Sequence, residues 1–387
     1  MSTLNDVVIN KLSGGLGRRN PEEDMISGLL FNGDPLPKLE VGKLARLASV
    51  EDAEALGITA DYDSATQSVY YQIQQFFRMN PSGDLYIMQA DLNTYPDLID
   101  YGALDMQVKA NGSIRQMGVI YSGTTTFLYT KEAIEVADSV TKLAYTQNMP
   151  FEIILEGKSF NVSSALSLDS LQAENVSVVI AMDAEKAVKY PNSAAVGLLL
   201  GAVSKAKVSE NIAWIEKFNL TGEGFSKSGF IGGQEITSLG DLKTLNDKRY
   251  IFTQTHTGLA GIYFNDSHTC TAGTSDFAYI ENNRTINKAT RLLRTALLPK
   301  LASPVLVDID GKLPQSVSKN FEGLCRSALE GMVANQEVSA FDVYVDPKQN
   351  ILATSELKVK AEITPIGTAR KIMVDLGFKN PFGIDKA

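Results

Sequence analysis

The feature that most constrains the fold is a regular alternation of strand-like and helix-like segments between residues 25 and 215. Short apolar, β-branched runs separated by longer amphipathic runs are typical of βαβ units. The run VSVVIAM is almost continuously apolar, which indicates a strand covered on both faces. We expect strands at 26–33, 85–89, 114–121, 151–157 and 176–182, and helices at 49–57, 64–79, 96–109, 130–147 and 164–172. These segments predict an α/β domain with a mainly parallel sheet.

The pattern changes after a Gly-rich stretch at 218–233. Residues 249–267 predict a β-hairpin that turns at Gly258 or Gly261, and two long helices follow. The chain then ends on a strand-like segment, for which we expect a hairpin that turns at Asp346-Pro347-Lys348. This second unit is of the α+β type.

A chain of 387 residues is too long for one ordinary core, so two domains are expected. We divide it into an N-terminal arm and linker (1–24), an outer α/β domain (25–240) and a C-terminal domain (241–387). Residues 4–12 are a short strand candidate, and Gly14, Gly15 and Gly17 after them predict a pliable link.

The C-terminal end is the most strand-like part of the chain. Apolar and polar residues alternate from Leu357 to Thr364, and the alternation resumes after Pro365 and Gly367. Its apolar members there are Ile372, Val374, Leu376 and Phe378. Almost no sequence follows to cover this strand, although an exposed strand edge is normally a liability.

Charge and composition exclude several classes of function. The chain has 36 basic and 45 acidic residues and a net charge of −9, which argues against nucleic acid as a general partner. The two cysteines, Cys270 and Cys325, have no disulfide-framework spacing and indicate a reduced protein. The apolar stretch at 194–203 is about half of the ~20 residues that span a bilayer, so we expect a buried helix and no membrane insertion.

No motif predicts catalysis, a cofactor or a metal. The loop SGGLGRR is followed by Asn20-Pro21 instead of a helix, so a hinge is favoured over a phosphate site. His256, His268 and Cys270 match no common zinc spacing, and Cys325 falls on the apolar face of a helix. We therefore expect no enzyme.

One helix carries a basic stripe, Arg284, Lys288, Arg291 and Arg294. On an acidic protein such a stripe is either a solvated face or a contact with an acidic partner.

With these features in view, the chain resembles contractile tail sheath proteins of phages, R-type pyocins, type VI secretion systems and related contractile injection systems. The resemblance is strongest over residues 240–387 and weaker over 40–90, and it is nearest to the sheath-like proteins of Bacteroidetes phages and prophages. The segments that carry it, in order, are TGLAGIYFNDS, SDFAYIENNRTINKA, ALEGMVANQEVSAFDVYVD and VKAEITPIGTARKIMVDLGF, with VGKLARLASVEDAEALG near the start.

The resemblance implies a structural subunit with an inner domain built from both termini, an inserted outer α/β domain and strand-exchanging terminal arms. Such subunits form stacked hexameric rings around an inner tail tube, meet baseplate and tail terminator proteins, and contract to drive the tube through an envelope. Assembly would take place in the bacterial cytoplasm, and the product would be a virion tail or an injection particle.

From this resemblance we expect both ends of the chain to add strands to neighbouring subunits. The residues expected to pair are Leu4, Val7, Val8, Ile9, Leu12, Ile372, Val374, Leu376 and Phe378. The expected hinges are Gly14, Gly15, Gly17, Pro365 and Gly367, and the basic stripe is a candidate contact with the tube or a neighbour.

Two alternatives stay open at the level of sequence. The first is an α/β enzyme with a nucleotide or small-molecule site in residues 25–215, at the carboxyl ends of the parallel strands. The second is a non-contractile tail or baseplate protein that shares the inner domain.

Overall fold

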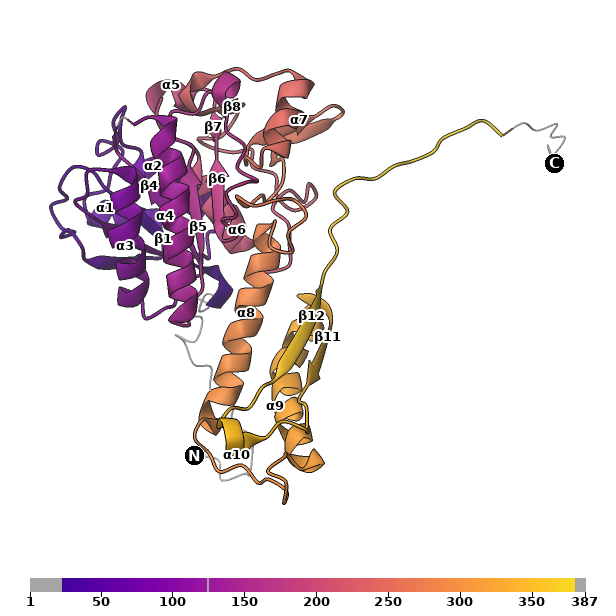
Figure 1. The fold of residues 1–387 in the computed structure, drawn as a ribbon. Helices are drawn as coiled ribbons and strands as arrows, with labels where there is room; N and C mark the ends of the chain where they lie inside the picture. Colours follow the sequence, from indigo (N-terminus) through magenta and orange to yellow (C-terminus); the bar gives the residue numbers. More distant parts are fainter. Residues whose placement is uncertain (1–22, 124, 380–387) are drawn as a thin grey trace, which may run out of the picture.

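The computed structural model describes residues 23–123 and 125–379 (Figure 1). Its largest sheet has six strands in the order β2-β3-β1-β4-β5-β6. Every neighbouring pair is parallel except β2 and β3, so β2 is an antiparallel edge strand. The strands are β1 (Ile26–Phe31), β2 (Leu44–Leu47), β3 (Asp84–Gln89), β4 (Gln116–Ile120), β5 (Glu152–Glu156) and β6 (Val176–Val179). The predicted α/β domain with a mainly parallel sheet is confirmed.

Helices cover both faces of this sheet. Gly28 and Leu30 of β1 face α3. Leu29 points to the opposite face of the sheet, which α6 covers. The helices concerned are α2 (Val69–Met79), α3 (Tyr95–Lys109), α4 (Phe127–Thr146) and α6 (Val196–Lys205), with the short α1 (Val50–Ala55) and α5 (Lys186–Lys189) beside them. The apolar stretch at 194–203 is thus a buried helix, as expected, and no helix of the described residues has the length and apolarity to cross a bilayer.

Two small sheets and a helix extend this unit. The predicted hairpin is present as β9 (Thr253–His256) and β10 (Leu259–Phe264), which are antiparallel and turn at Gly258 with φ of 84°. The other elements are β7 (Ala181–Asp183), β8 (Ser228–Phe230), α7 (Leu239–Asp247) and the 3₁₀ turns η1 (Glu23–Met25), η2 (Val162–Ser164) and η3 (Ile231–Gly233).

Two predictions for this unit were wrong in detail. The helix expected at 164–172 is absent, and only the turn η2 forms near its start. The strand expected at 176–182 is divided into β6 and β7, because residue 180 leaves the large sheet and bonds instead to Ile231 and Ile251.

The C-terminal unit consists of two long helices and a two-stranded sheet. α8 (Ile280–Leu297), ending in the turn η4 (Leu298–Lys300), and α9 (Gln315–Ala334) pack together, and α9 also packs on β11 (Val338–Tyr344). β11 pairs with β12 (Lys360–Pro365), and α10 (Ile351–Thr354) lies in the connection.

The hairpin predicted around Asp346-Pro347-Lys348 is therefore wrong. Residues after that turn form a loop and α10, and the partner of β11 is the alternating segment 360–365 instead.

The buried apolar residues of the described chain form one large core and two small ones. The large core extends from Leu29 to Ile280 and contains the six-stranded sheet. The second lies between α8, α9 and the β11–β12 sheet, and includes Ala289 and Cys325. Cys325 is thus a core residue, as predicted. The domain boundaries expected at residues 24 and 240 stay predictions.

Candidate assembly interface

The chain beyond β12 contacts the body at its root and then extends away from it (Figure 1). We call residues 366–379 the C-terminal arm; Figure 1 shows it as an extended trace that leaves the end of β12 and continues into solvent. Five large apolar side chains of the arm are between 77% and 108% exposed. They are Ile372, Met373, Val374, Leu376 and Phe378. A contiguous exposed apolar segment of this kind marks an interaction site.

The β11–β12 sheet is a suitable acceptor for a further strand. Its partly buried face, with Phe341, Ala361 and Ile363, packs on the second core, while Lys360 and Glu362 are exposed. In the described chain β12 pairs with β11 alone. Part of β11 already contacts α9, because the guanidinium of Arg326 in α9 donates a hydrogen bond to the backbone carbonyl of Val343. The outer edge of β12 is accordingly the more open one.

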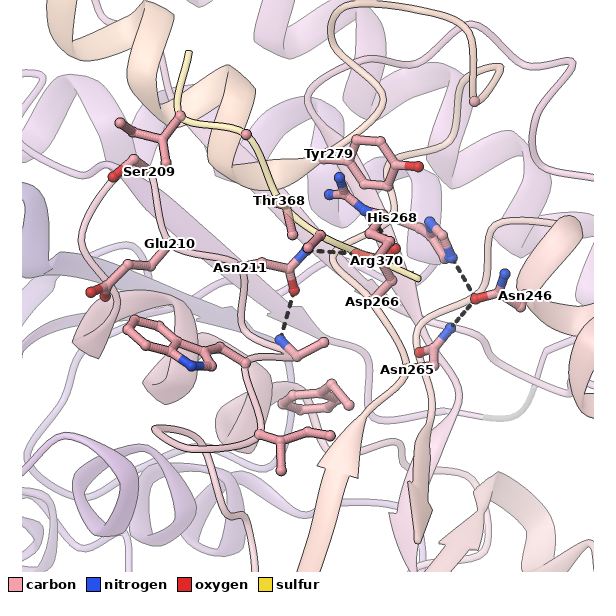
Figure 2. Close-up of a pocket in the computed structure, with 18 of the residues that line it drawn as sticks. Ser209, Glu210, Asn211, Asn246, Asn265, Asp266, His268, Tyr279, Thr368 and Arg370 are labelled. Carbon is pink, nitrogen blue, oxygen red and sulfur yellow. Dashed lines mark hydrogen bonds and ion pairs between the residues drawn. The ribbon is translucent and has the colours of Figure 1, made fainter. Parts of the chain in front are cut away.

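The root of the arm is held to the body by Arg370 (Figure 2). Its Nε lies 2.9 Å from Oδ2 of Asp266, and its Nη2 lies 2.6 Å from Oε1 of Glu281. The guanidinium also stacks on the ring of Tyr279, 3.4 Å from its centroid. Asn211 donates to both carboxylates, at 2.6 and 3.0 Å. The arm residues 366–370 and Ile372 line one side of a cavity of about 1270 Å³ here.

The charges of this cluster are set by burial and by Arg370. Burial raises the pKa of Glu281 above its usual range, although the hydrogen bond from Ser267 and the charge of Arg370 oppose it. Burial acts in the same direction on Asp266, but there His268, Arg370 and the hydrogen bond from Asn211 prevail and lower the pKa. Because burial lowers the pKa of His268 to about 3, that ring is neutral at neutral pH. His268 therefore stabilises the ionised form of Asp266 only when its ring is protonated, and at neutral pH Arg370 is the charged partner that does so.

The predicted basic stripe does not form a free face on the described chain. Arg284 is 4% exposed, and its guanidinium donates to the carbonyls of Ala206 and Asp24 at 3.2 Å. Lys288 and Arg291 bind the two oxygens of the Asp24 carboxylate, at 2.5 and 2.7 Å. The solvated-face interpretation is wrong for these three residues.

Arg294, the last member of the stripe, is exposed. A contact of the stripe with a tube or a neighbour stays a prediction, and Arg294 is the member that is accessible for it.

The other candidate residues have structural surroundings. The Nε2 of His268 lies 2.9 Å from Oδ1 of Asn246, and the described residues contain no group of three or more His, Cys, Asp or Glu side chains placed to hold a metal. His256 packs against the ring of Tyr263. Cys270 is fully buried, and burial raises the pKa of its thiol.

At the carboxyl ends of the parallel strands, where the enzyme alternative would place its ligand, polar side chains bind backbone groups of the chain itself. At the carboxyl ends of β1 and β4, Asn32 accepts from the backbone N–H of Ser122 at 2.7 Å. At the end of β5, the buried Glu156 accepts from the N–H groups of Tyr121 and Ala194 and forms an ion pair with Lys158. The large cavity lies elsewhere, beside the arm.

Several predicted residues lie outside the described residues, namely Leu4, Val7, Val8, Ile9, Leu12, Gly14, Gly15 and Gly17. Of the two predicted C-terminal hinges, Pro365 ends β12 and Gly367 lies in the arm. A Cβ at Gly367 would meet no atom within 4 Å, so this conformation does not require glycine there.

Arg370 and Asp24 are the functional candidates that sequence reasoning missed. Arg370 lies in the quoted PIGTAR segment, next to Lys371, and nothing in the sequence distinguished it from a solvated basic residue. Asp24 gave no signal, because its partners on α8 are more than 260 residues away.

Comparison with known proteins covers nearly the whole chain. Residues 4–268 match the family model "DUF2586, N-terminal domain", and residues 276–383 match "DUF2586, C-terminal domain". Among curated proteins, none matches the sequence significantly.

Solved structures share the fold at low sequence identity. The helical sheath of the anti-feeding prophage in its contracted state has a TM-score of 0.68 and 14% identity, over 98% of this chain and 100% of that one. The PVC sheath of an extracellular contractile injection system, also contracted, has a TM-score of 0.61 and 11% identity, over 98% of both chains. A sheath tail protein from Desulfitobacterium hafniense has a TM-score of 0.55 and 10% identity, over 93% of this chain and 100% of that one.

Proposed function

Because the chain belongs to the DUF2586 family and has the fold of contractile sheath proteins, we propose that it is the structural subunit of a contractile tail sheath. In this proposal it polymerises as stacked hexameric rings around an inner tube and contracts to drive that tube forward. Its role is structural and not catalytic. Its partners are further copies of itself, the tube, the baseplate and a tail terminator, in a phage tail or an injection particle.

The observation that supports this proposal best is the C-terminal arm. Ile372, Val374, Leu376 and Phe378 alternate in sequence, are exposed, and have no strand partner in the described chain. A strand with one apolar face and no partner is suited to β-augmentation, in which main-chain hydrogen bonds give affinity and alternate side chains give register. We propose that the arm of one subunit pairs with the outer edge of β12 in the next.

The proposed positions of the two units in the assembly follow from the same arrangement. The C-terminal unit, with β11, β12 and the arm, forms the inner layer that links subunits. The α/β unit lies outside it, and the first 24 residues supply the second exchanged strand.

The test is a comparison of assembly by three variants in negative-stain electron microscopy and sedimentation. Deletion of residues 371–387 should give a folded protein that forms no tubes, because the exchanged strand is gone. Val374→Asp should raise the critical concentration for assembly about tenfold or more, since burying a valine side chain is worth about 1.5–3 kcal/mol. Met373→Asp is the matched control, because its side chain lies on the opposite face of the strand.

Long hollow tubes from the intact protein, lost in the deletion and in Val374→Asp, would support the proposal. Strand exchange would be contradicted if the protein without residues 371–387 formed tubes. It would also be contradicted if Val374→Asp and Met373→Asp raised the critical concentration equally. Closed rings without tubes would support instead the alternative of a non-contractile tail or baseplate component.

A further inference from the structure

Both ends of the described chain are tied to the same helix by ion pairs. At the first turn of α8, Glu281 binds Arg370 of the C-terminal arm. Two to three turns further, Lys288 and Arg291 bind Asp24, the second residue of the described chain. We propose that α8 is the common anchor of both terminal arms, and that Arg370 and Asp24 are positioning residues that fix where each arm leaves the body. This inference rests on the proposed exchange of terminal strands.

The C-terminal anchor has the properties of a built site. Arg370 makes a hydrogen bond to each of two carboxylates and stacks on Tyr279, so its guanidinium is fixed in three directions. The Glu281 side chain is 3% exposed and that of Asp266 11%, which shields both ion pairs from solvent. From residue 367 onward every described residue of the arm is exposed. Among these described residues, Arg370 is the one whose side chain forms ion pairs with the body.

The N-terminal anchor is equally connected. Besides its two ion pairs, Asp24 accepts a hydrogen bond at its backbone carbonyl from Arg284. Lys288 also binds Glu337, which directly precedes β11, at 2.6 Å. Burial would raise the pKa of Asp24, but the charges of Lys288, Arg284 and Arg291 prevail and lower it. These contacts therefore tie Asp24, at the start of the described chain, to α8 and to the start of the β11–β12 sheet.

The two anchors have opposite polarity. The acidic site on α8 accepts a basic residue of the C-terminal arm, and the basic site accepts an acidic residue of the N-terminal root. Neither root could occupy the other site without placing like charges together. At a rise of about 1.5 Å per residue, the seven to ten residues between them set the two exit points roughly 10–15 Å apart along one helix axis.

The position of α8 gives this arrangement a mechanical consequence. Ile280, at its start, belongs to the large core, and Ala289 belongs to the core of the C-terminal unit. Figure 1 shows α8 extending from the α/β unit along the β11–β12 sheet. A pull on either arm is thus transmitted to both cores through one helix. In an assembly linked by exchanged strands, the subunit would move as one body.

The first test measures the arm root in the unassembled protein. Spin labels at Thr368→Cys and Lys243→Cys, both exposed positions, report the distance between the arm root and α7; the natural thiols are buried. Arg370→Ala should broaden this distance distribution at least twofold. Lys371→Ala removes a charge from the adjacent exposed residue and should leave it unchanged. Circular dichroism confirms that both variants are folded.

The second test measures assembly. Arg370→Ala and Asp24→Ala should each raise the critical concentration about tenfold or more, or give tubes of irregular diameter. Lys371→Ala should assemble like the parent protein. Asp24→Ala combined with Arg291→Ala should have less than the sum of the effects of the two single variants, because both remove the same ion pair.

The outcomes separate this inference from the proposed function. If the protein without residues 371–387 still assembles, strand exchange itself is wrong. If that deletion blocks assembly, but Arg370→Ala keeps a narrow distance distribution and assembles like the parent, the anchor is wrong and strand exchange stands.

Discussion

At the scale of single residues, buried charge is used to fix segments that lie far apart in sequence. Asp24 and Arg370 are examples at the surface of α8. Inside the α/β unit, the buried Glu156 joins segments through the N–H groups of Tyr121 and Ala194. Breaking such a pair leaves an uncompensated charge, so each fixes a specific arrangement more than it adds net stability.

Asp63 gives a prediction about pH. It accepts hydrogen bonds from the N–H groups of Tyr70 and Tyr71, at 2.8 and 2.9 Å, and so caps the start of α2. Burial raises its pKa to about 6, although these hydrogen bonds oppose the shift. Between pH 4 and 6 the folded protein then holds a proton that the unfolded chain releases. The contribution of Asp63 to stability is therefore greatest below pH 4 and falls as the pH rises through 6.

The measurement is urea denaturation of the parent protein and of Asp63→Asn between pH 4 and 7. The stability of the parent relative to the variant should fall by about 3 kcal/mol over this range, at about 1.4 kcal/mol per pKa unit. A constant difference, or one that grows with pH, would contradict this account of Asp63.

The basic stripe shows what sequence could predict at this scale. Its spacing placed Arg284, Lys288 and Arg291 on one helix face, and that is where they lie. Their role could not be predicted, because their partner Asp24 is distant in sequence and becomes a neighbour only when the fold forms.

At the scale of elements, close helix packing defines the α/β unit. Gly197 of α6 lies against the backbone of α2, and its N–H donates to Oε1 of Gln72 at 2.7 Å. A Cβ at this position would lie 2.0 Å from the carbonyl oxygen of Gln72. Because that oxygen belongs to a helix backbone, the two helices would have to separate.

Gly197→Ala should therefore destabilise the protein by about 2–3 kcal/mol. Gly323→Ala, in α9, is the matched control, because a Cβ there meets no atom within 4 Å. That change should stabilise the protein by about 0.5–1 kcal/mol, through better helix propensity. Urea denaturation midpoints measure both effects, and a lowered midpoint for the α9 variant or an unchanged one for Gly197→Ala would contradict the packing argument.

The predictability of the elements depended on their surroundings. Buried strands and amphipathic helices of the α/β unit have strong periodic patterns, and β1, β3, β4 and β5 lie where expected. The C-terminal hairpin was misplaced because Asp346-Pro347 is a strong turn signal, whereas the pairing of β11 with β12 spans a loop and a short helix. Local turn chemistry does not determine which strand returns to pair.

At the scale of the whole molecule, a large α/β unit and a smaller unit share one long helix, and an unpaired arm extends from the smaller unit (Figure 1). The fold matches contractile sheath proteins over nearly the full chain at 10–14% identity. The alternating residues at the C-terminus, together with the resemblance to sheath proteins, led us to expect an exchanged strand, and this expectation stays a prediction.

The most direct measurement of this account is a cryo-electron microscopy reconstruction of the assembled protein. We predict a hollow helical tube in which residues 371–379 of one subunit form a strand along the outer edge of β12 in its neighbour, while Arg370 stays on Glu281 and Asp266 of its own subunit. A tube in which residues 371–379 pair with their own subunit, or no tube at all, would contradict it.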